Sequence, residues 1–179
     1  MYYLSANLGA ALPIATIAQD ILADRITVTE YLDYLRDAAM INVVANYSNN
    51  KGKTLRKNKK YYITDCGVRN AMLKKSEFSA KEEGLLAETG CLARLKQLAE
   101  NSGGTIYYYR DNGREVDFVL DANNYLLPIE VKYRNAIAPV QVQTVLEFIL
   151  TNKSPYGLIL TKDTMQVQSN VVFIPAWLI

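Results

Sequence analysis

Residues 114–132 read REVDFVLDANNYLLPIEVK, and the order of apolar and polar residues in this stretch predicts how the chain folds. Two alternating runs flank Asn123 and Asn124, a dipeptide typical of a tight turn, so we expect a β-hairpin. With the turn at these asparagines, apolar residues face apolar residues and charges face charges, which supports this register. The expected pairs are Val116 with Val131, Phe118 with Ile129, Leu120 with Leu127, Asp117 with Glu130 and Glu115 with Lys132.

The polar face of this hairpin carries a cluster of charges. Asp117 and Glu130 would have Cβ atoms about 4.5–5.5 Å apart, and like charges so placed destabilise a sheet. A hard divalent cation such as Mg²⁺ or Mn²⁺ would compensate them, because such ions take carboxylate and carbonyl oxygens. Lys132 lies on the same face, two residues beyond Glu130. The alternative is a solvated polar face on which the charges pair at random.

A third acid comes from a predicted helix. Residues 79–82, Ser-Ala-Lys-Glu, form a capping-box pattern, and the helix should run to about Glu100 before the break at 101–104. Glu88 falls in the middle of its apolar stripe, where a carboxylate is costly unless it is paired, coordinated or protonated. A Glu at the exposed end of the stripe that reaches water is the alternative. The stripe consists of Leu85, Cys91, Leu92, Leu95 and Ala99.

The elements around these residues follow a definite order. A strand is expected over 105–110, then the hairpin, then a helix over about 139–152 with its proline in the first turn. Residues 157–160, Gly-Leu-Ile-Leu, are typical of a short buried strand. The predicted order from residue 80 onward is therefore αβββαβ.

Three short motifs in this order resemble a known superfamily: GLLAE at 84–88, EVDF at 115–118 and PIEVK at 128–132. They are similar to the motifs of PD-(D/E)XK nucleases. The resemblance is closer to the uncharacterised C-terminal region of prokaryotic AAA+ ATPases, in which a winged helix links the ATPase module to a nuclease-like domain. It implies an α/β (α+β) chain: a winged helix-turn-helix over 1–73, then over 74–179 a restriction-endonuclease-like core with a mixed sheet.

What this resemblance implies is metal-dependent hydrolysis of a nucleic-acid phosphodiester. Asp117 and Glu130 would hold Mg²⁺ or Mn²⁺, helped by the Val131 carbonyl, and Glu88 would hold the ion through water or bind a second one. Lys132 would orient the attacking water and stabilise charge on the phosphate. None of these tasks needs histidine, which the chain lacks. The alternative is a non-catalytic adaptor that binds DNA or protein for an ATPase and keeps the fold as a scaffold.

The first 73 residues have a different organisation. Three short helices are expected over 2–10, 13–21 and 27–39, followed by strands over 41–44 and 60–63, which resembles a winged helix-turn-helix. The helix 27–39 carries three acids and one arginine, a poor face for DNA. Transcriptional regulation by this unit alone is therefore the weaker reading, and a spacer or protein-contact role is favoured.

Positive charge is concentrated in the predicted wing. Six of the chain's 20 basic residues lie there, which leaves 14 basic and 18 acidic residues elsewhere. Such a run can bind phosphate backbones without reading sequence, although a basic run is also typical of a solvated or disordered loop. The six residues are Lys51, Lys53, Arg56, Lys57, Lys59 and Lys60.

The expected partners are nucleic acid, most simply DNA, and an AAA+ ATPase module outside this chain. Residues 52–54, Gly-Lys-Thr, mimic the end of a P-loop, but Tyr47 occupies the position of its first glycine, so no ATP site is expected here. The sequence has no run near the roughly 20 apolar residues of a membrane span and no basic lead of a signal peptide. We therefore expect no membrane partner and a cytoplasmic location.

Overall fold

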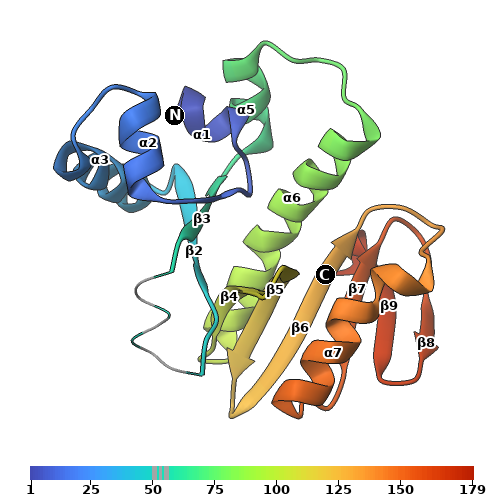
Figure 1. The fold of residues 1–179 in the computed structure, drawn as a ribbon. Coiled ribbons are helices and arrows are strands. Elements are labelled where there is room, and N and C mark those ends of the chain that lie inside the picture. The colour runs from blue at the N-terminus through green and yellow to red at the C-terminus, as the bar shows by residue number, and fades with distance from the viewer. Residues whose placement is uncertain (50–51, 53, 55–56) are drawn as a thin grey trace. The chain divides into compact units, whose positions relative to one another are not determined.

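The computed structural model describes residues 1–49, 52, 54 and 57–179, and its chain divides into two compact units (Figure 1). The first unit is Met1–Ser79 and the second is Ala80–Ile179. The second unit contains the hairpin and the helix on which the predicted site depends.

The first unit contains the three expected helices and the expected hairpin. β3 lies between β1 and β2 and is antiparallel to both. The predicted helix over 2–10 is wrong beyond Ala6, because the chain turns at Gly9, whose φ of 68° is easily reached by glycine. β1 and α5 were not predicted. The elements are α1 Tyr2–Ala6, β1 Ala11–Leu12, α2 Ile14–Asp20, α3 Arg25–Asp37, β2 Ile41–Asn46, β3 Lys59–Ile63 and α5 Cys66–Leu73.

Helix α3 begins where a side chain caps it. Asp24 accepts hydrogen bonds from the backbone N–H groups of Ile26 and Thr27, each at 2.9 Å, which satisfies two donors of the first turn. One face of the helix buries Val28 and Leu32. Capping and one apolar face thus fix this helix in its unit.

The second unit contains a mixed sheet with the strand order β4-β5-β6-β7-β9-β8. β7 is parallel to both β6 and β9, and the other pairs are antiparallel. The expected αβββαβ order is present, and β8 and β9 extend the sheet beyond it. The elements are α6 Ala80–Asn101, β4 Thr105–Asp111, β5 Arg114–Ala122, β6 Tyr125–Lys132, the 3-10 turn η1 Pro139–Gln141, α7 Gln143–Asn152, β7 Gly157–Thr161, β8 Gln166–Gln168, β9 Val171–Pro175 and the 3-10 turn η2 Ala176–Leu178.

The predicted hairpin register is confirmed over its turn end, where Phe118 pairs with Ile129 and the ladder continues to Ala122 and Tyr125. Beyond Phe118 the two strands part. The start of β5 pairs with β4, while residues 130–132 of β6 pair with β7. We call residues 115–117 together with 130–132 the β5–β6 fork.

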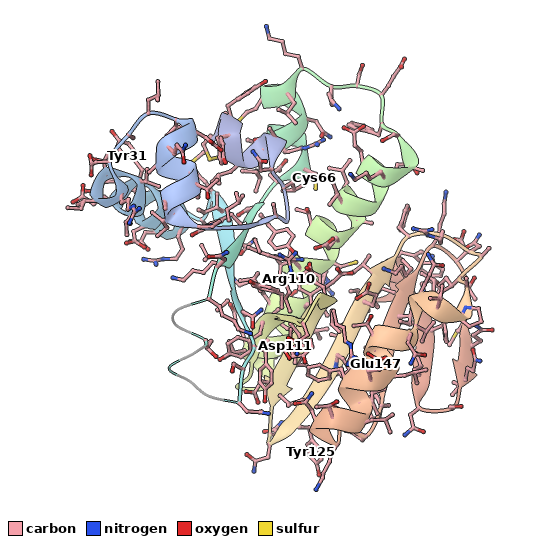
Figure 2. All side chains as sticks on the ribbon, in the orientation of Figure 1. Tyr31, Cys66, Arg110, Asp111, Tyr125 and Glu147 are labelled. Carbon is pink, nitrogen blue, oxygen red and sulfur yellow. The ribbon has the colours of Figure 1, made fainter. Side chains whose placement is uncertain are left out.

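The three predicted pairs beyond Phe118 are not in the β5–β6 ladder: Val116 with Val131, Asp117 with Glu130 and Glu115 with Lys132. On its other edge β5 pairs Glu115 with Arg110 of β4, and the two side chains form an ion pair. The neighbouring Arg114 is bound to Glu147 of α7 at 3.0 Å (Figure 2 labels Arg110 and Glu147). The start of β5 is thus bound to β4 and α7, while its ladder with β6 ends at Phe118.

Helices cover both faces of the sheet. Helix α7 packs on β7, and a Cβ on Gly157 would lie 2.5 Å from Val145 Cγ1 and 3.2 Å from Pro128 Cγ, so only glycine fits there. The single predicted helix over 139–152 is in fact η1 followed by α7. The apolar cluster under α7 contains Val142, Val145, Ile149, Ile159, Val171 and Phe173.

Helix α6 contacts β4, β5 and β6. Four of the five predicted stripe residues are buried, but Leu85 is only half-buried. Thr89 is buried instead, and its hydroxyl donates to the Leu85 carbonyl at 2.8 Å, which satisfies the polar group inside the core. The N-terminal half of α6 is therefore less deeply packed than its C-terminal half.

Candidate functional site

The fork brings Asp117 against the backbone of the neighbouring strand. Its Oδ2 accepts a hydrogen bond of 2.8 Å from the backbone N–H of Val131, and its own N–H donates to Glu130 Oε2 at 3.2 Å. Because the carboxylate is bonded to an amide of β6, it occupies the gap between the two strands. The divergence of β5 and β6 thus creates the space in which the two acids meet.

Glu130 is buried, with 7% of its surface exposed. Burial and, next, the negative charge of Asp117 raise its pKa from 4.5 to about 7, and Lys132 only partly offsets them. Lys132 Nζ donates to Glu130 Oε1. Burial lowers the pKa of this ammonium, but the charges of Glu130 and Asp117 outweigh burial and leave the pKa raised. Lys132 is therefore charged at neutral pH, whereas Glu130 loses its proton near pH 7.

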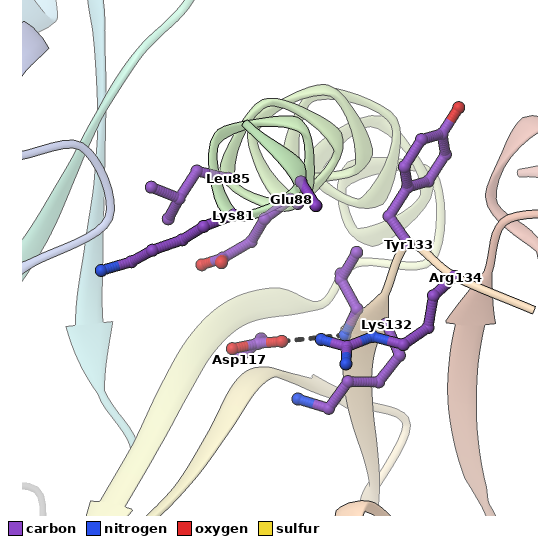
Figure 3. Close-up of a pocket in the computed structure, with 10 residues that line it drawn as sticks. Lys81, Leu85, Glu88, Asp117, Lys132, Tyr133 and Arg134 are labelled. Carbon is purple, nitrogen blue, oxygen red and sulfur yellow. Dashed lines mark hydrogen bonds between the residues drawn. The ribbon is translucent and has the colours of Figure 1, made fainter. Parts of the chain in front are cut away.

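A cavity of about 480 Å³ opens beside the fork. Helix α6 supplies one wall and the ends of β5 and β6 the other, and Figure 3 shows the Glu88 carboxylate pointing from the helix toward Asp117. Glu130 is buried behind Asp117 and Lys132, to both of which it is hydrogen bonded. The lining residues are Ala80, Lys81, Gly84, Leu85, Glu88, Asp117, Val131, Lys132, Tyr133 and Arg134.

The four residues predicted for catalysis thus lie in one region of the second unit. The sequence reading missed Lys81, Tyr133 and Arg134, which line the same cavity. A signal existed for Lys81, because it precedes Glu88 by seven residues and so lies on the same helical face. Arg134 and Tyr133 continue β6 past its last paired residue, where no periodicity applies.

Cys91 lies deeper in α6, close to these acids. Burial, followed by the charges of Glu88 and Asp117, raises its pKa to about 12. This thiol therefore stays protonated and packs as an apolar residue, so it is neither a nucleophile nor a thiolate ligand at neutral pH.

The donor set of the fork fits a hard divalent cation. Two carboxylates and the Val131 carbonyl are the oxygen ligands that Mg²⁺ and Mn²⁺ prefer, and Mg²⁺ is commonly bound by one or two carboxylates together with substrate phosphates. The pKa of Glu130 is raised by burial and, next, by the charge of Asp117, and a cation bound to both carboxylates would offset both effects. Over the described residues, no group of three or more His, Cys, Asp or Glu is arranged to hold a metal ion.

The predicted wing is described in part. Lys51, Lys53 and Arg56 lie outside the described residues, whereas Lys57 is half-buried and Lys59 is exposed. Lys60 is only 2% exposed, because β3 lies between β1 and β2. Of the described members of the run, Lys60 is therefore the least suited to contact a phosphate.

The comparisons with known proteins identify a family. The model of the family described as "Domain of unknown function (DUF4143)" matches residues 83–179, more than half of the chain, and the chain therefore belongs to this family. A second model, described as "Domain of unknown function (DUF8612)", matches residues 1–79. No curated protein matches the chain.

One solved structure is similar over much of the chain: the crystal structure of protein VC1899 from Vibrio cholerae. The two are 15% identical with a TM-score of 0.36, and the match covers 98% of this chain and 46% of that one. The chain thus spans less than half the length of VC1899. Within the described part of the chain, no helix is long and apolar enough to cross a membrane.

Proposed function

We propose that the second unit is a PD-(D/E)XK nuclease-like domain that hydrolyses nucleic-acid phosphodiester bonds at the β5–β6 fork. The observation that carries this proposal is the meeting of Asp117 and Glu130 in the gap between the diverging strands, with Lys132 bonded to Glu130. Two acids and a charged lysine beside an open cavity are the groups that such a reaction needs.

Each residue has a distinct role in this proposal. Asp117 and Glu130, with the Val131 carbonyl, would hold Mg²⁺ or Mn²⁺, and Glu88 would bind through water from the opposite wall. When bound, the ion supplies a water of lowered pKa and positive charge beside the phosphate. Lys132 keeps its charge at neutral pH and would stabilise the negative charge that develops on the phosphate.

For the first unit we propose a winged helix-turn-helix. Three helices followed by the β2–β3 hairpin support it, and the basic run between these strands would contact phosphates. The DUF4143 family is commonly found alongside AAA ATPases, which supports an ATPase module as a partner. DNA is the proposed substrate, and the winged unit would hold it near the ATPase.

A second candidate is a non-catalytic adaptor that binds DNA or protein and keeps the fold as a scaffold. The bond between Lys132 and Glu130 favours it, because a buried acid neutralised within the protein needs no metal. The adaptor is also favoured because, over the described residues, no group of three or more His, Cys, Asp or Glu is arranged to hold a metal ion. The two candidates therefore differ in whether a divalent cation displaces Lys132 from Glu130.

The test is cleavage of plasmid, single-stranded circular DNA and an RNA oligonucleotide, with Mg²⁺, Mn²⁺ or EDTA. The nuclease proposal predicts cleavage that requires the metal and falls at least about 100-fold in Asp117→Asn and in Lys132→Ala. The matched control is Asp121→Asn, on the same strand but inside the paired ladder, which should cut at the wild-type rate.

The outcomes separate the two candidates. Cleavage that survives both Asp117→Asn and Lys132→Ala would show that the fork is not the active site. A wild-type chain that cuts none of the three substrates but still binds DNA supports the adaptor instead.

A further inference from the structure

A second cavity of about 450 Å³ lies on the other side of Tyr133. Helix α6 contributes Leu86, Ala87 and Gly90, and η2, at the C-terminal end of the chain, contributes Trp177. A Cβ built on Gly90 would meet no atom within 4 Å, so the space above this turn of the helix is open. The part of the cavity wall formed by Leu86, Ala87 and Gly90 is thus apolar and has no bulky side chain at Gly90.

Two aromatic rings stand at this cavity with much of their surface in solvent. Trp177, the chain's single tryptophan, is 68% exposed, and Tyr133 is 37% exposed. Lys162 Nζ lies 5.6 Å from the centre of the Tyr133 ring. Exposed aromatic faces beside a cation are what a strand of unpaired bases binds, because the bases stack and the cation attracts the phosphates.

Tyr133 lines this cavity and also the one beside the fork. It follows Lys132 directly, so the proposed catalytic lysine is next in sequence to a residue that lines the second cavity. The cations along the two cavities are Lys81, Lys132, Arg134 and Lys162, against the carboxylates of Glu83, Glu88 and Asp117. Among the residues that line the two cavities, the cations therefore outnumber the carboxylates by one even when no metal ion is bound.

We propose that the two cavities form one binding path for single-stranded nucleic acid, with bases stacked on Trp177 and Tyr133 and the scissile phosphate at the fork. This inference rests on the proposed function for the position of the reacting phosphate. Duplex is disfavoured, because its bases already stack on one another and are not free to cover these rings. The path therefore defines a substrate class: a single strand or a frayed end.

The test uses the full chain in EDTA, so that binding is measured without cleavage. Because Trp177 is the single tryptophan, its emission reports directly on stacking. Oligo(dT) and oligo(rU) of equal length serve as the two single-stranded arms, and a duplex of that length serves as the third. We expect single strands to quench Trp177 emission in a saturable way and the duplex to quench it little. The single strand that quenches at the lower concentration, oligo(dT) or oligo(rU), shows whether DNA or RNA is the preferred ligand.

Variants test the path by fluorescence anisotropy of a labelled oligonucleotide. Trp177→Ala and Tyr133→Ala should each weaken binding about tenfold, whereas Trp177→Phe should retain most of it. Lys162→Gln should make the salt dependence shallower by about one phosphate contact. Tyr125→Ala is the matched control, because this tyrosine is 65% exposed at the β5–β6 turn, away from both cavities (labelled in Figure 2).

Unchanged Trp177 emission at saturating oligonucleotide would overturn the inference, as would wild-type affinity in both Trp177→Ala and Tyr133→Ala. Its failure is distinguishable from that of the proposed function. If Asp117→Asn loses cleavage but oligonucleotides leave the Trp177 emission of the wild-type chain unchanged, the binding path is refuted and the nuclease proposal stands. Strong quenching in a chain that cuts nothing supports the path as a binding site and removes the nuclease.

Discussion

The buried carboxyl of Glu130 should make the stability of the second unit depend on pH. Without metal, its pKa is about 7 in the folded chain against 4.5 for an ordinary glutamate. The folded chain binds this proton more tightly, so the stabilisation is complete below about pH 4.5, is lost as pH rises, and is absent above about pH 7. This rise in pKa corresponds to about 3 kcal/mol.

Replacing Glu130 with glutamine removes the titration and keeps the side-chain shape. The free energy of unfolding of Glu130→Gln minus that of the wild type should therefore increase by about 2–3 kcal/mol between pH 5 and pH 8. The substitution also removes the carboxylate that Lys132 binds, which changes the stability at both pH values. The quantity to compare is therefore the change in the stability difference between pH 5 and pH 8.

The assay is urea unfolding in EDTA at both pH values, followed by Trp177 fluorescence, which reports on the second unit. Glu100→Gln, on the exposed face of α6, controls for the amide substitution itself. If the free energy of unfolding of Glu130→Gln minus that of the wild type is equal at pH 5 and pH 8, within error, the reasoning that burial and Asp117 disfavour the ionised form of Glu130 is refuted.

Two further predictions concern packing and charge. Gly157→Ala should destabilise the second unit by about 1–3 kcal/mol in thermal unfolding, because the new Cβ would lie 2.5 Å from Val145 Cγ1; Gly84→Ala, whose Cβ meets no atom within 4 Å, should not, and equal melting temperatures for the two variants would contradict this packing. Neutralising Lys51, Lys53, Arg56 and Lys57 together should weaken DNA binding and make its salt dependence shallower, which titrations at several salt concentrations would measure, and unchanged binding at low salt would exclude the wing.

The sequence was most informative where side-chain alternation and turn chemistry agree. Asn123 and Asn124 both adopt positive φ, which asparagine tolerates, and this turn sets the confirmed pairing of Phe118 with Ile129. The same argument failed at Glu115, because the ladder between β5 and β6 ends at Phe118 and Ile129, and Glu115 binds Arg110 of β4 instead. The point at which two paired strands diverge is not encoded in their alternation.

Burial was harder to predict than secondary structure. Lys60 reads as part of a solvated basic run, yet it is buried because β1, a strand of two residues with no recognisable signal, pairs beside it. Tyr133 and Trp177 gave no periodic signal either, since Tyr133 follows the last residue of β6 and Trp177 lies in the short turn η2 after β9. The candidate site was found from its charges, whereas its aromatic neighbours needed the fold.

Calorimetric titration of Mn²⁺ into the wild-type chain and into Asp117→Asn at pH 8 tests most directly whether the β5–β6 fork is a metal site. At this pH Glu130 is largely ionised. The account predicts saturable binding to the wild type that is lost or weakened at least about tenfold in Asp117→Asn, because one of the two carboxylate ligands is gone. Identical isotherms for the two proteins, or no binding to the wild type, would contradict it.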